Sequence, residues 1–240
     1  MENRLKPICG PTYDYSQNGE NWTYEVTGTR QTPIDIITAD CAAEDYGVEV
    51  DVKDVDGVDV IYKHNQLQVN YDSSTLKLTK GDEESNWKAL QFHFHAPCEH
   101  TVDSKQHDVE FHLVHVGIDK PGQLLVLGIM FEKEEGALPS EFIESLKLEN
   151  LPGACSNLNL KIADMVNTCV EGHKFNYPGS LTTPPCSEIV EWVLVKETMK
   201  VPPEQIALFT RLWQDNPNFA GGKGNNRCLQ DLAGRTVNLI

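Results

Sequence analysis

The sequence is poor in basic residues and has no long apolar run. Lysine and arginine together number 20 against 36 aspartates and glutamates, which gives a formal net charge of −16 at pH 7. Such an acidic surface disfavours binding to nucleic acid or to anionic membranes and keeps a protein soluble. The chain nowhere approaches the roughly 20 consecutive apolar residues of a membrane-spanning helix, so we expect no transmembrane segment.

The chain also lacks composition shifts, low-complexity linkers and internal repeats that would mark a domain boundary. Its 240 residues are enough to bury one sizeable core. Short strand-like runs separated by Gly, Asn and Asp dominate, which predicts a mainly β (α+β) single domain. The expected strands are Val48–Val52, Val58–Tyr62, Leu67–Tyr71, Leu76–Leu78, Leu90–Phe94, Val109–Val116, Leu124–Phe131 and Ile189–Val195, and the expected short helices are Ser140–Leu148 and Pro203–Trp213.

Cysteine is plentiful, but no pair has the CxxC spacing of a cysteine zinc cluster. Seven cysteines are many for a reduced cytosolic protein of this size, so we expect disulfide bonds and a secreted, extracellular or lumenal location. Asn21-Trp-Thr23 is a candidate glycosylation acceptor. The N-terminal residues lack the apolar run of a signal peptide, so we expect a mature chain with an added Met1.

The segment Gln91-Phe-His-Phe-His95 is the most informative in the sequence. Side chains alternate across a β-strand, so His93 and His95 lie on one face, about 7 Å apart, while the two phenylalanines face a core. Glu110-Phe-His112 repeats the spacing on a second predicted strand. Two such strands side by side present three imidazoles to one point. Three nitrogen ligands and one open position are typical of a catalytic zinc site.

The same strands provide partners for the ligands. A metal-bound imidazole needs an acceptor for its other N–H group, which fixes the orientation of the ring. Gln91 and Glu110 each precede a histidine by two residues on the same face, so we expect them to hold His93 and His112. The alternative is a buried polar ladder without a metal, but burying so many polar groups without a common partner is unfavourable.

Further motifs lie along the chain in the order of one known family. They are Arg30-Gln-Thr-Pro-Ile-Asp-Ile36, Val126-Leu-Gly128, Tyr177-Pro-Gly-Ser-Leu-Thr-Thr-Pro-Pro185, Glu188 to Trp192 and Asn225-Asn-Arg-x-Leu-Gln230. With the histidine motifs they resemble the α-class carbonic anhydrases from about residue 13 to the C-terminus. The resemblance implies one domain over 1–240, with about 1–12 as an N-terminal extension, around a large, twisted, mostly antiparallel central sheet with short surface helices.

The resemblance also implies an activity. Members of that family are zinc lyases that hydrate carbon dioxide reversibly to bicarbonate and a proton by means of zinc-bound hydroxide. It makes His93, His95 and His112 the ligands of Zn²⁺, sulfonamides and anions the expected inhibitors, and ester hydrolysis a side activity. Of the other histidines, it implies buried structural positions for His100 and His115 and leaves His107 and His173 as surface residues.

The resemblance assigns the remaining catalytic groups to two loops and an apolar wall. Thr182 matches the threonine that accepts a hydrogen bond from zinc hydroxide and donates its own proton to a carboxylate, here Glu99. Thr183 matches a residue that stabilises bicarbonate or an inhibitor anion. The wall that receives carbon dioxide is implied to consist of Val114, Val126, Leu181 and Trp192.

Two features depart from the family pattern. Anchoring the alignment on Gln68-Val-Asn70 places Asn65 at the position of the family's proton-shuttle histidine and His64 one residue earlier. One step along a strand reverses a side chain, so His64 and Asn65 are both shuttle candidates.

The second departure concerns disulfides. Secreted relatives commonly join a cysteine upstream of the Arg30 motif to one at the position of Cys186, but Thr23 to Thr29 contains no cysteine. Cys41 or Cys9 is the alternative partner, and Cys98 and Cys228 leave room for an unusual pairing. As in the family, we expect a cis bond before Pro185, with Thr32–Pro33 a second candidate.

The competing hypothesis is a carbonic-anhydrase-like module that has lost catalysis and serves in binding, storage or adhesion. Such relatives typically lack one or more of the zinc histidines. This chain keeps all of them together with Glu99 and Thr182, which favours the enzyme.

Overall fold

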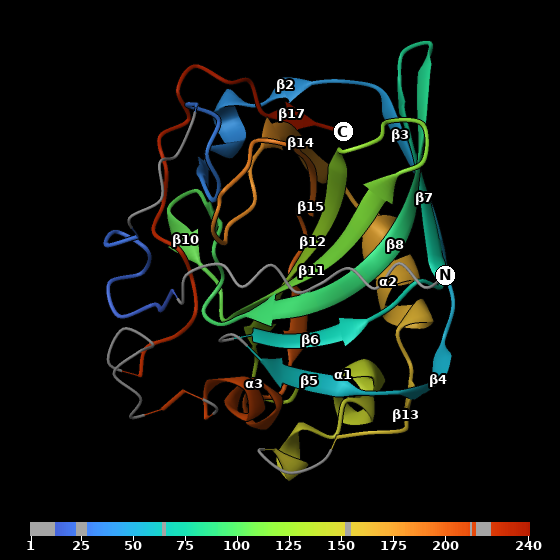
Figure 1. Ribbon diagram of the computed structural model, residues 1–240, viewed down its shortest axis with the longest axis vertical. Coiled ribbons are helices and arrows are strands. Elements are labelled where there is room, and N and C mark those ends of the chain that lie inside the picture. The colour runs from blue at the N-terminus through green and yellow to red at the C-terminus, as the bar shows by residue number, and fades with distance from the viewer. Residues whose placement is uncertain (1–12, 23–27, 64–65, 152–154, 212, 215–221) are drawn as a thin grey trace, which may run out of the picture.

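The computed structural model describes residues 13–22, 28–63, 66–151, 155–211, 213–214 and 222–240 (Figure 1). These residues form one mainly β domain around a large twisted sheet with few short helices, which confirms the predicted fold class. The expected N-terminal extension, 1–12, and both shuttle candidates, His64 and Asn65, lie outside the described residues.

The central sheet has 12 strands. Its main path runs in the order β2 (Ala42–Ala43), β17 (Asn238–Leu239), β14 (Lys174–Gly179), β15 (Val190–Val195), β12 (Leu124–Lys133), β11 (Val109–Gly117), β8 (Glu83–His95), β6 (Gln66–Asn70) and β5 (Val60–Lys63). Beside this path β3 (Tyr46–Val52) pairs with β7 (Ser74–Lys80), β7 pairs with β8, and β16 (Met199–Val201) pairs with β12. Most pairs are antiparallel, whereas β12 runs parallel to β15 and β16, and β2 runs parallel to β17.

Smaller elements surround the central sheet. The strands β1 (Asp35–Ile36), β9 (Thr101–Val102) and β10 (Lys105–Gln106) form one small sheet, and β4 (Val55–Val58) pairs with β13 (Leu158–Leu160). The helices are α1 (Glu141–Ser145), α2 (Ala163–Val170) and α3 (Pro203–Thr210), with the 3-10 turns η1 (Thr38–Asp40) and η2 (Leu148–Asn150). They lie at the periphery, α1 against β13, α2 against β3 and α3 against β12 (Figure 1). No described helix is long and apolar enough to cross a membrane.

The pairing of β8 with β11 positions the site. His93 lies opposite His112, and Phe94 lies opposite Phe111. Because neighbouring side chains alternate, one face of this pair carries the histidines and the other faces the core. There the Phe111 ring packs at centroid distances of 5.3 Å from Phe92 and 5.5 Å from Phe94. The alternation of aromatic and imidazole side chains thus separates core from site.

A bulge in β8 changes which residues face the core. The register pairs Val114 with Gln91 but His115 with Ala89, so Leu90 has no partner in β11. Trp87 and Ala89 belong to the core, whereas Gln91, an even number of residues further on, faces the histidine side. Without the extra residue these side chains would share one face. The bulge therefore joins two alternation patterns into one long strand.

The cysteines are not paired as expected. The six cysteines that the structure describes, Cys41, Cys98, Cys155, Cys169, Cys186 and Cys228, are free thiols. Of the two partners left open for Cys186, Cys41 is therefore wrong, because Cys41 Sγ donates to the Ile37 carbonyl of its own turn at 3.5 Å while Cys186 is buried in another loop. Cys9 lies outside the described residues. The expected secreted, extracellular or lumenal location stays a prediction, as does glycosylation of Asn21, which is exposed.

Both proline predictions are confirmed. The Thr32–Pro33 and Pro184–Pro185 bonds are cis. A third cis bond, Ala96–Pro97, was not expected from the sequence.

Candidate metal centre

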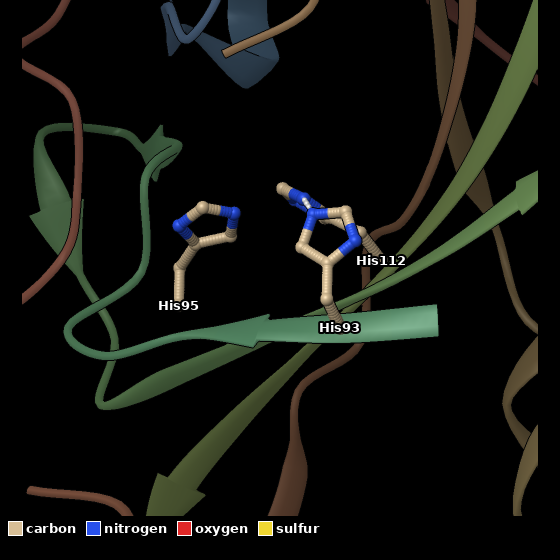
Figure 2. A group of neighbouring side chains, drawn as sticks. All are labelled: His93, His95 and His112. Atoms are coloured by element: carbon tan, nitrogen blue, oxygen red, sulfur yellow. Dashed lines mark hydrogen bonds between the residues drawn. The ribbon is translucent and has the colours of Figure 1, made fainter. Parts of the chain in front are cut away.

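Three histidines from two adjacent strands converge on one point (Figure 2). His93 and His95 project from the end of β8, and His112 projects from β11. Each offers a ring nitrogen, and these nitrogens all lie within 4.8 Å of one another. The side chains are buried, with at most 8% exposure for His93. The predicted ligand set is therefore one cluster in space.

The outer nitrogens of two of these rings are held by the expected partners. His93 Nδ1 lies 2.9 Å from Gln91 Oε1, and His112 Nε2 lies 2.7 Å from Glu110 Oε1. Amide and carboxylate oxygens only accept hydrogen bonds, so each of these ring nitrogens carries the proton. The lone pairs are thereby left on His93 Nε2 and His112 Nδ1, which face the common point.

The third ring is held by a group that the sequence reasoning missed. His95 Nδ1 lies 2.8 Å from the backbone carbonyl of Asn225. The side chain of Asn225 fixes that segment, since Oδ1 accepts from the Ala96 N–H at 2.9 Å and Nδ2 donates to the Phe94 carbonyl at 3.1 Å. A backbone carbonyl leaves no signal in the sequence. His95 Nε2 is buried without a hydrogen-bond partner among the described residues, as an unshared lone pair facing the cluster would be.

The spacing of the free nitrogens fits a metal. His93 Nε2 and His112 Nδ1 lie 3.3 Å apart. Two nitrogens bound to a tetrahedral zinc at about 2.0–2.1 Å are separated by roughly 3.3–3.4 Å. Two lone pairs at this distance repel each other unless a cation or a proton lies between them. Burial lowers the pKa of all three rings, that of His95 to about 4, so the rings are neutral at pH 7.

Glu110 is fully saturated with donors. Oε1 accepts from His112 Nε2 and from His100 Nδ1 at 2.6 Å, and Oε2 accepts the backbone N–H groups of Glu99 and His100 at 2.8 and 2.9 Å. Burial alone would raise the pKa of Glu110, but the two histidines hold it well below its ordinary value. His100, Glu110 and His112 also form a group of possible metal ligands, but their atoms are joined by hydrogen bonds. This group is therefore the support of the site.

Glu99 and Thr182 lie together beside the cluster. Glu99 Oε1 accepts the Arg227 backbone N–H at 2.8 Å and lies 3.4 Å from His95 Nδ1. Burial raises the pKa of Glu99 to about 7, and the Thr182 hydroxyl is close enough to lower it. Glu99 Oε2 makes no complete hydrogen bond in the described part of the chain. Thr182 is itself buried, with 5% of its surface exposed.

The predicted apolar wall follows the histidines along the sheet. Val114 lies opposite Val126, and Val126 lies opposite Trp192, so the three form one row across β11, β12 and β15. The preceding row pairs His112 with Gly128. All three wall side chains are at most 4% exposed. Leu181 is half-buried and packs against this group.

Three further described histidines, His107, His115 and His173, are not part of the cluster. His115 is fully buried, and its Nδ1 lies 3.1 Å from the Leu113 carbonyl. His173 is exposed, as predicted. The predicted surface position of His107 is wrong, because only 9% of its side chain is exposed and Nδ1 lies 3.6 Å from Glu132 Oε2.

The fold and the site together define a class: a single β domain with a buried three-histidine cluster and one face open to an apolar wall. Residues 17–240 match the family model of the eukaryotic-type carbonic anhydrases. The chain therefore belongs to the eukaryotic-type carbonic anhydrase family.

Similar proteins from distant organisms are also carbonic anhydrases. The chain is 31% identical over 221 residues to alpha carbonic anhydrase 4 of Arabidopsis thaliana, covering 90% of this chain and 77% of that protein. It is 34% identical over 194 residues to a carbonic anhydrase of Nostoc sp., covering 79% and 71%.

Solved structures show the same similarity. Carbonic anhydrase Cah3 from Chlamydomonas reinhardtii in complex with acetazolamide aligns with a TM-score of 0.71 and 31% identity, over 89% of this chain and 92% of that one. A halotolerant carbonic anhydrase from Dunaliella salina aligns with a TM-score of 0.76 and 25% identity, over 98% and 99%.

Proposed function

We propose that this protein holds a zinc ion on His93, His95 and His112 and hydrates carbon dioxide reversibly to bicarbonate and a proton. One observation carries the proposal: three lone-pair nitrogens converge, and the other nitrogen of each ring is held by an acceptor. Three neutral nitrogen ligands leave one tetrahedral position for water. Family membership supports the same activity.

A zinc ion held by His93, His95 and His112 would lower the pKa of a bound water to about 7 and so supply a hydroxide nucleophile at neutral pH. The protein's part is to orient that nucleophile. Thr182 would accept a hydrogen bond from the O–H of the attacking oxygen and donate its own hydroxyl hydrogen bond to Glu99, so that no proton is transferred at this point. The buried Glu99 carboxylate, held through Oε1 by the Arg227 N–H, keeps Oε2 for Thr182. Thr183 then holds the product anion.

The apolar wall receives the substrate. Carbon dioxide is small and nonpolar, so it gains little from a polar site. It also gives up few hydrogen bonds when it moves from water to an apolar surface. Val114, Val126, Leu181 and Trp192 border the histidine row without offering a charged group. The wall therefore accepts carbon dioxide beside the nucleophile and releases the charged product.

His64 and Asn65 belong to this proposal as proton-shuttle candidates, although they lie outside the described residues. Turnover of His64→Ala, measured against buffer concentration, tests the first candidate. We expect a stronger dependence on buffer than in the unmodified protein, because the buffer then carries the proton. An unchanged dependence would remove His64 from the mechanism.

The experiment for the proposal as a whole measures zinc content and carbon dioxide hydration on the same preparation. We expect one zinc per chain and a hydration rate that acetazolamide suppresses, as the Chlamydomonas relative was solved with that compound. A preparation that contains no zinc and shows no hydration of carbon dioxide would refute the proposal. Zinc without hydration would favour the binding, storage or adhesion module. Ester hydrolysis, if measured with the same zinc dependence, is a side activity of the same site.

A further inference from the structure

A buried hydrogen-bond chain leads away from the candidate ligand His112. Glu110 Oε1 accepts from His112 and from His100 Nδ1, so the proton of His100 lies on Nδ1 and its Nε2 is an acceptor. Tyr177 Oη lies 2.6 Å from that Nε2 and therefore donates its proton to it. All four side chains are at most 1% exposed, so water does not replace any of these partners.

Thr32 continues the chain. Its Oγ1 lies 3.3 Å from the Tyr177 oxygen, and it accepts the backbone N–H of Ser180 at 3.0 Å. Because the tyrosine proton is already used on His100, the Thr32 hydroxyl proton is the one available between the two oxygens. The donor and acceptor role of each member is thus determined by its neighbours from Glu110 to Ser180.

Ser180 begins the loop that carries Thr182. The Thr32 N–H donates to Ser180 Oγ at 3.0 Å, which makes a reciprocal pair with the bond from the Ser180 N–H. Ser180 Oγ in turn lies 2.8 Å from the Leu181 carbonyl, directly before Thr182. Thr32 and Ser180 are both fully buried. One threonine therefore contacts both the ligand support and the catalytic loop.

We propose that Thr32 is a positioning residue that joins the support of His112 to the loop carrying Thr182, an inference that rests on the proposed function. Without its hydroxyl, the Ser180 N–H is buried without an acceptor and the Tyr177 oxygen loses its donor. The first loss displaces the loop that orients the nucleophile. The second loosens the chain that holds His100, Glu110 and the ligand ring.

The test compares Thr32→Val, which keeps the shape and removes the hydroxyl, with Thr32→Ser, which keeps the hydroxyl. Two quantities are measured on the zinc-loaded protein: the rate of zinc release to excess chelator, and kcat and KM for carbon dioxide hydration. For Thr32→Val we expect release about 3- to 10-fold faster, below the 10- to 100-fold of direct partners. We expect kcat to fall at least about 5-fold with KM nearly unchanged, as for a misplaced catalytic group.

Thr32→Ser should restore both quantities to within about 2-fold of the unmodified protein, since outer partners act through the hydroxyl. The control is Ser140→Ala, which removes a buried hydroxyl that caps α1 by accepting the Ile143 N–H. It should lower stability by about 1 kcal/mol and leave zinc release unchanged. If Thr32→Val lowers stability in the same way but changes neither release nor kcat, the inference is wrong. Failure of Thr32→Ser to restore them would also overturn it.

Tyr177→Phe tests the chain even if Thr32→Val does not fold. It cuts the connection to His100 but leaves the Thr32 acceptor for Ser180 in place, so release should accelerate while kcat falls less. In the double variant release should match the faster single variant, because one chain is interrupted twice. Unchanged release in Tyr177→Phe, or additive effects, would contradict the inference. These release rates remain informative if the protein binds zinc without hydrating carbon dioxide, so the two proposals fail separately.

Discussion

The carboxylate of Glu110 combines a negative charge with four hydrogen bonds, two of them from imidazoles. Glu110→Gln keeps the shape but removes the charge and turns an N–H group toward a donor. We expect zinc to bind about 10- to 100-fold more weakly, as for other direct partners of metal ligands. Chelator competition measures the dissociation constant.

The matched control is Glu191→Gln. Glu191 is another carboxylate of the sheet, more exposed than the fully buried Glu110, and its Oε1 accepts from Lys80 and Asn176, neither of which is a candidate ligand. Its removal should leave the zinc dissociation constant unchanged. Equal effects of the two substitutions would show that Glu110 acts only through general stability.

His115 should make the zinc-free protein sensitive to acid. Burial lowers its pKa from 6.5 to about 4. The folded state thus favours the neutral ring, so its contribution is fully present above pH 6.5 and is lost as the pH falls toward 4. The full loss amounts to roughly 3 kcal/mol. Urea unfolding of His115→Gln should show a smaller loss between pH 7 and 4.5 than the unmodified protein.

The exposed His173 provides the comparison for this measurement. His173→Gln should lose stability with acid just as the unmodified protein does. If His115→Gln also loses as much stability with acid as the unmodified protein, the burial of His115 does not contribute to the pH dependence of stability.

At the residue scale, the alternation of side chains across a strand predicted more of the site than the amino-acid composition did. The spacing of His93, His95 and His112 placed the rings on one face, and Gln91 and Glu110 followed from the same rule. Asn225 could not be found in this way, because its backbone carbonyl and not its side chain holds His95. A main-chain acceptor can belong to any residue type.

At the scale of elements, the approach of β14 to the Thr32 segment leaves no room for a side chain at Gly179. A Cβ there would lie 2.3 Å from Thr32 Oγ1 and 2.8 Å from Trp192 Cδ1, both buried. Gly179→Ala should lower the free energy of unfolding by about 1–3 kcal/mol, as other overpacked sites do. Urea denaturation measures the change.

Gly47→Ala is the control within a strand. Its Cβ would approach only Thr79, at 3.5 Å, which is an ordinary contact. Its effect should stay within about 0.5 kcal/mol. If Gly179→Ala is as mild as this control, β14 and the Thr32 segment separate more easily than their packing indicates.

The differences between the predicted and the observed elements have physical causes. β8 begins at Glu83 and not at Leu90, because the bulge at Leu90 interrupts the alternation that a regular strand would show. β14 contains Lys174, Asn176 and Pro178, which read as a turn but are satisfied by partners in this fold. α2 has no capping side chain and no proline at its start, whereas the predicted helices α1 and α3 begin with a Ser140 cap and with Pro203.

At the scale of the whole molecule, the large core does not depend on the metal. The candidate ligands already have their hydrogen bonds without an ion, and the aromatic cluster lies on the opposite side of β8. Removing zinc should therefore leave the near-ultraviolet circular dichroism spectrum of the folded protein largely unchanged. Zinc at 100 times its dissociation constant adds about 2.7 kcal/mol, which raises Tm by roughly 5–10 °C. Unfolding on chelation at 25 °C would contradict this account.

We infer that three histidines hold a zinc ion that makes this chain a carbon dioxide hydratase. The most direct test is the stopped-flow hydration rate of one preparation as purified, after chelation, and after the return of one equivalent of zinc. We expect a rate that is lost on chelation and restored by the single equivalent, with His95→Ala inactive in all three states. A rate that survives chelation, or that His95→Ala retains, would contradict it.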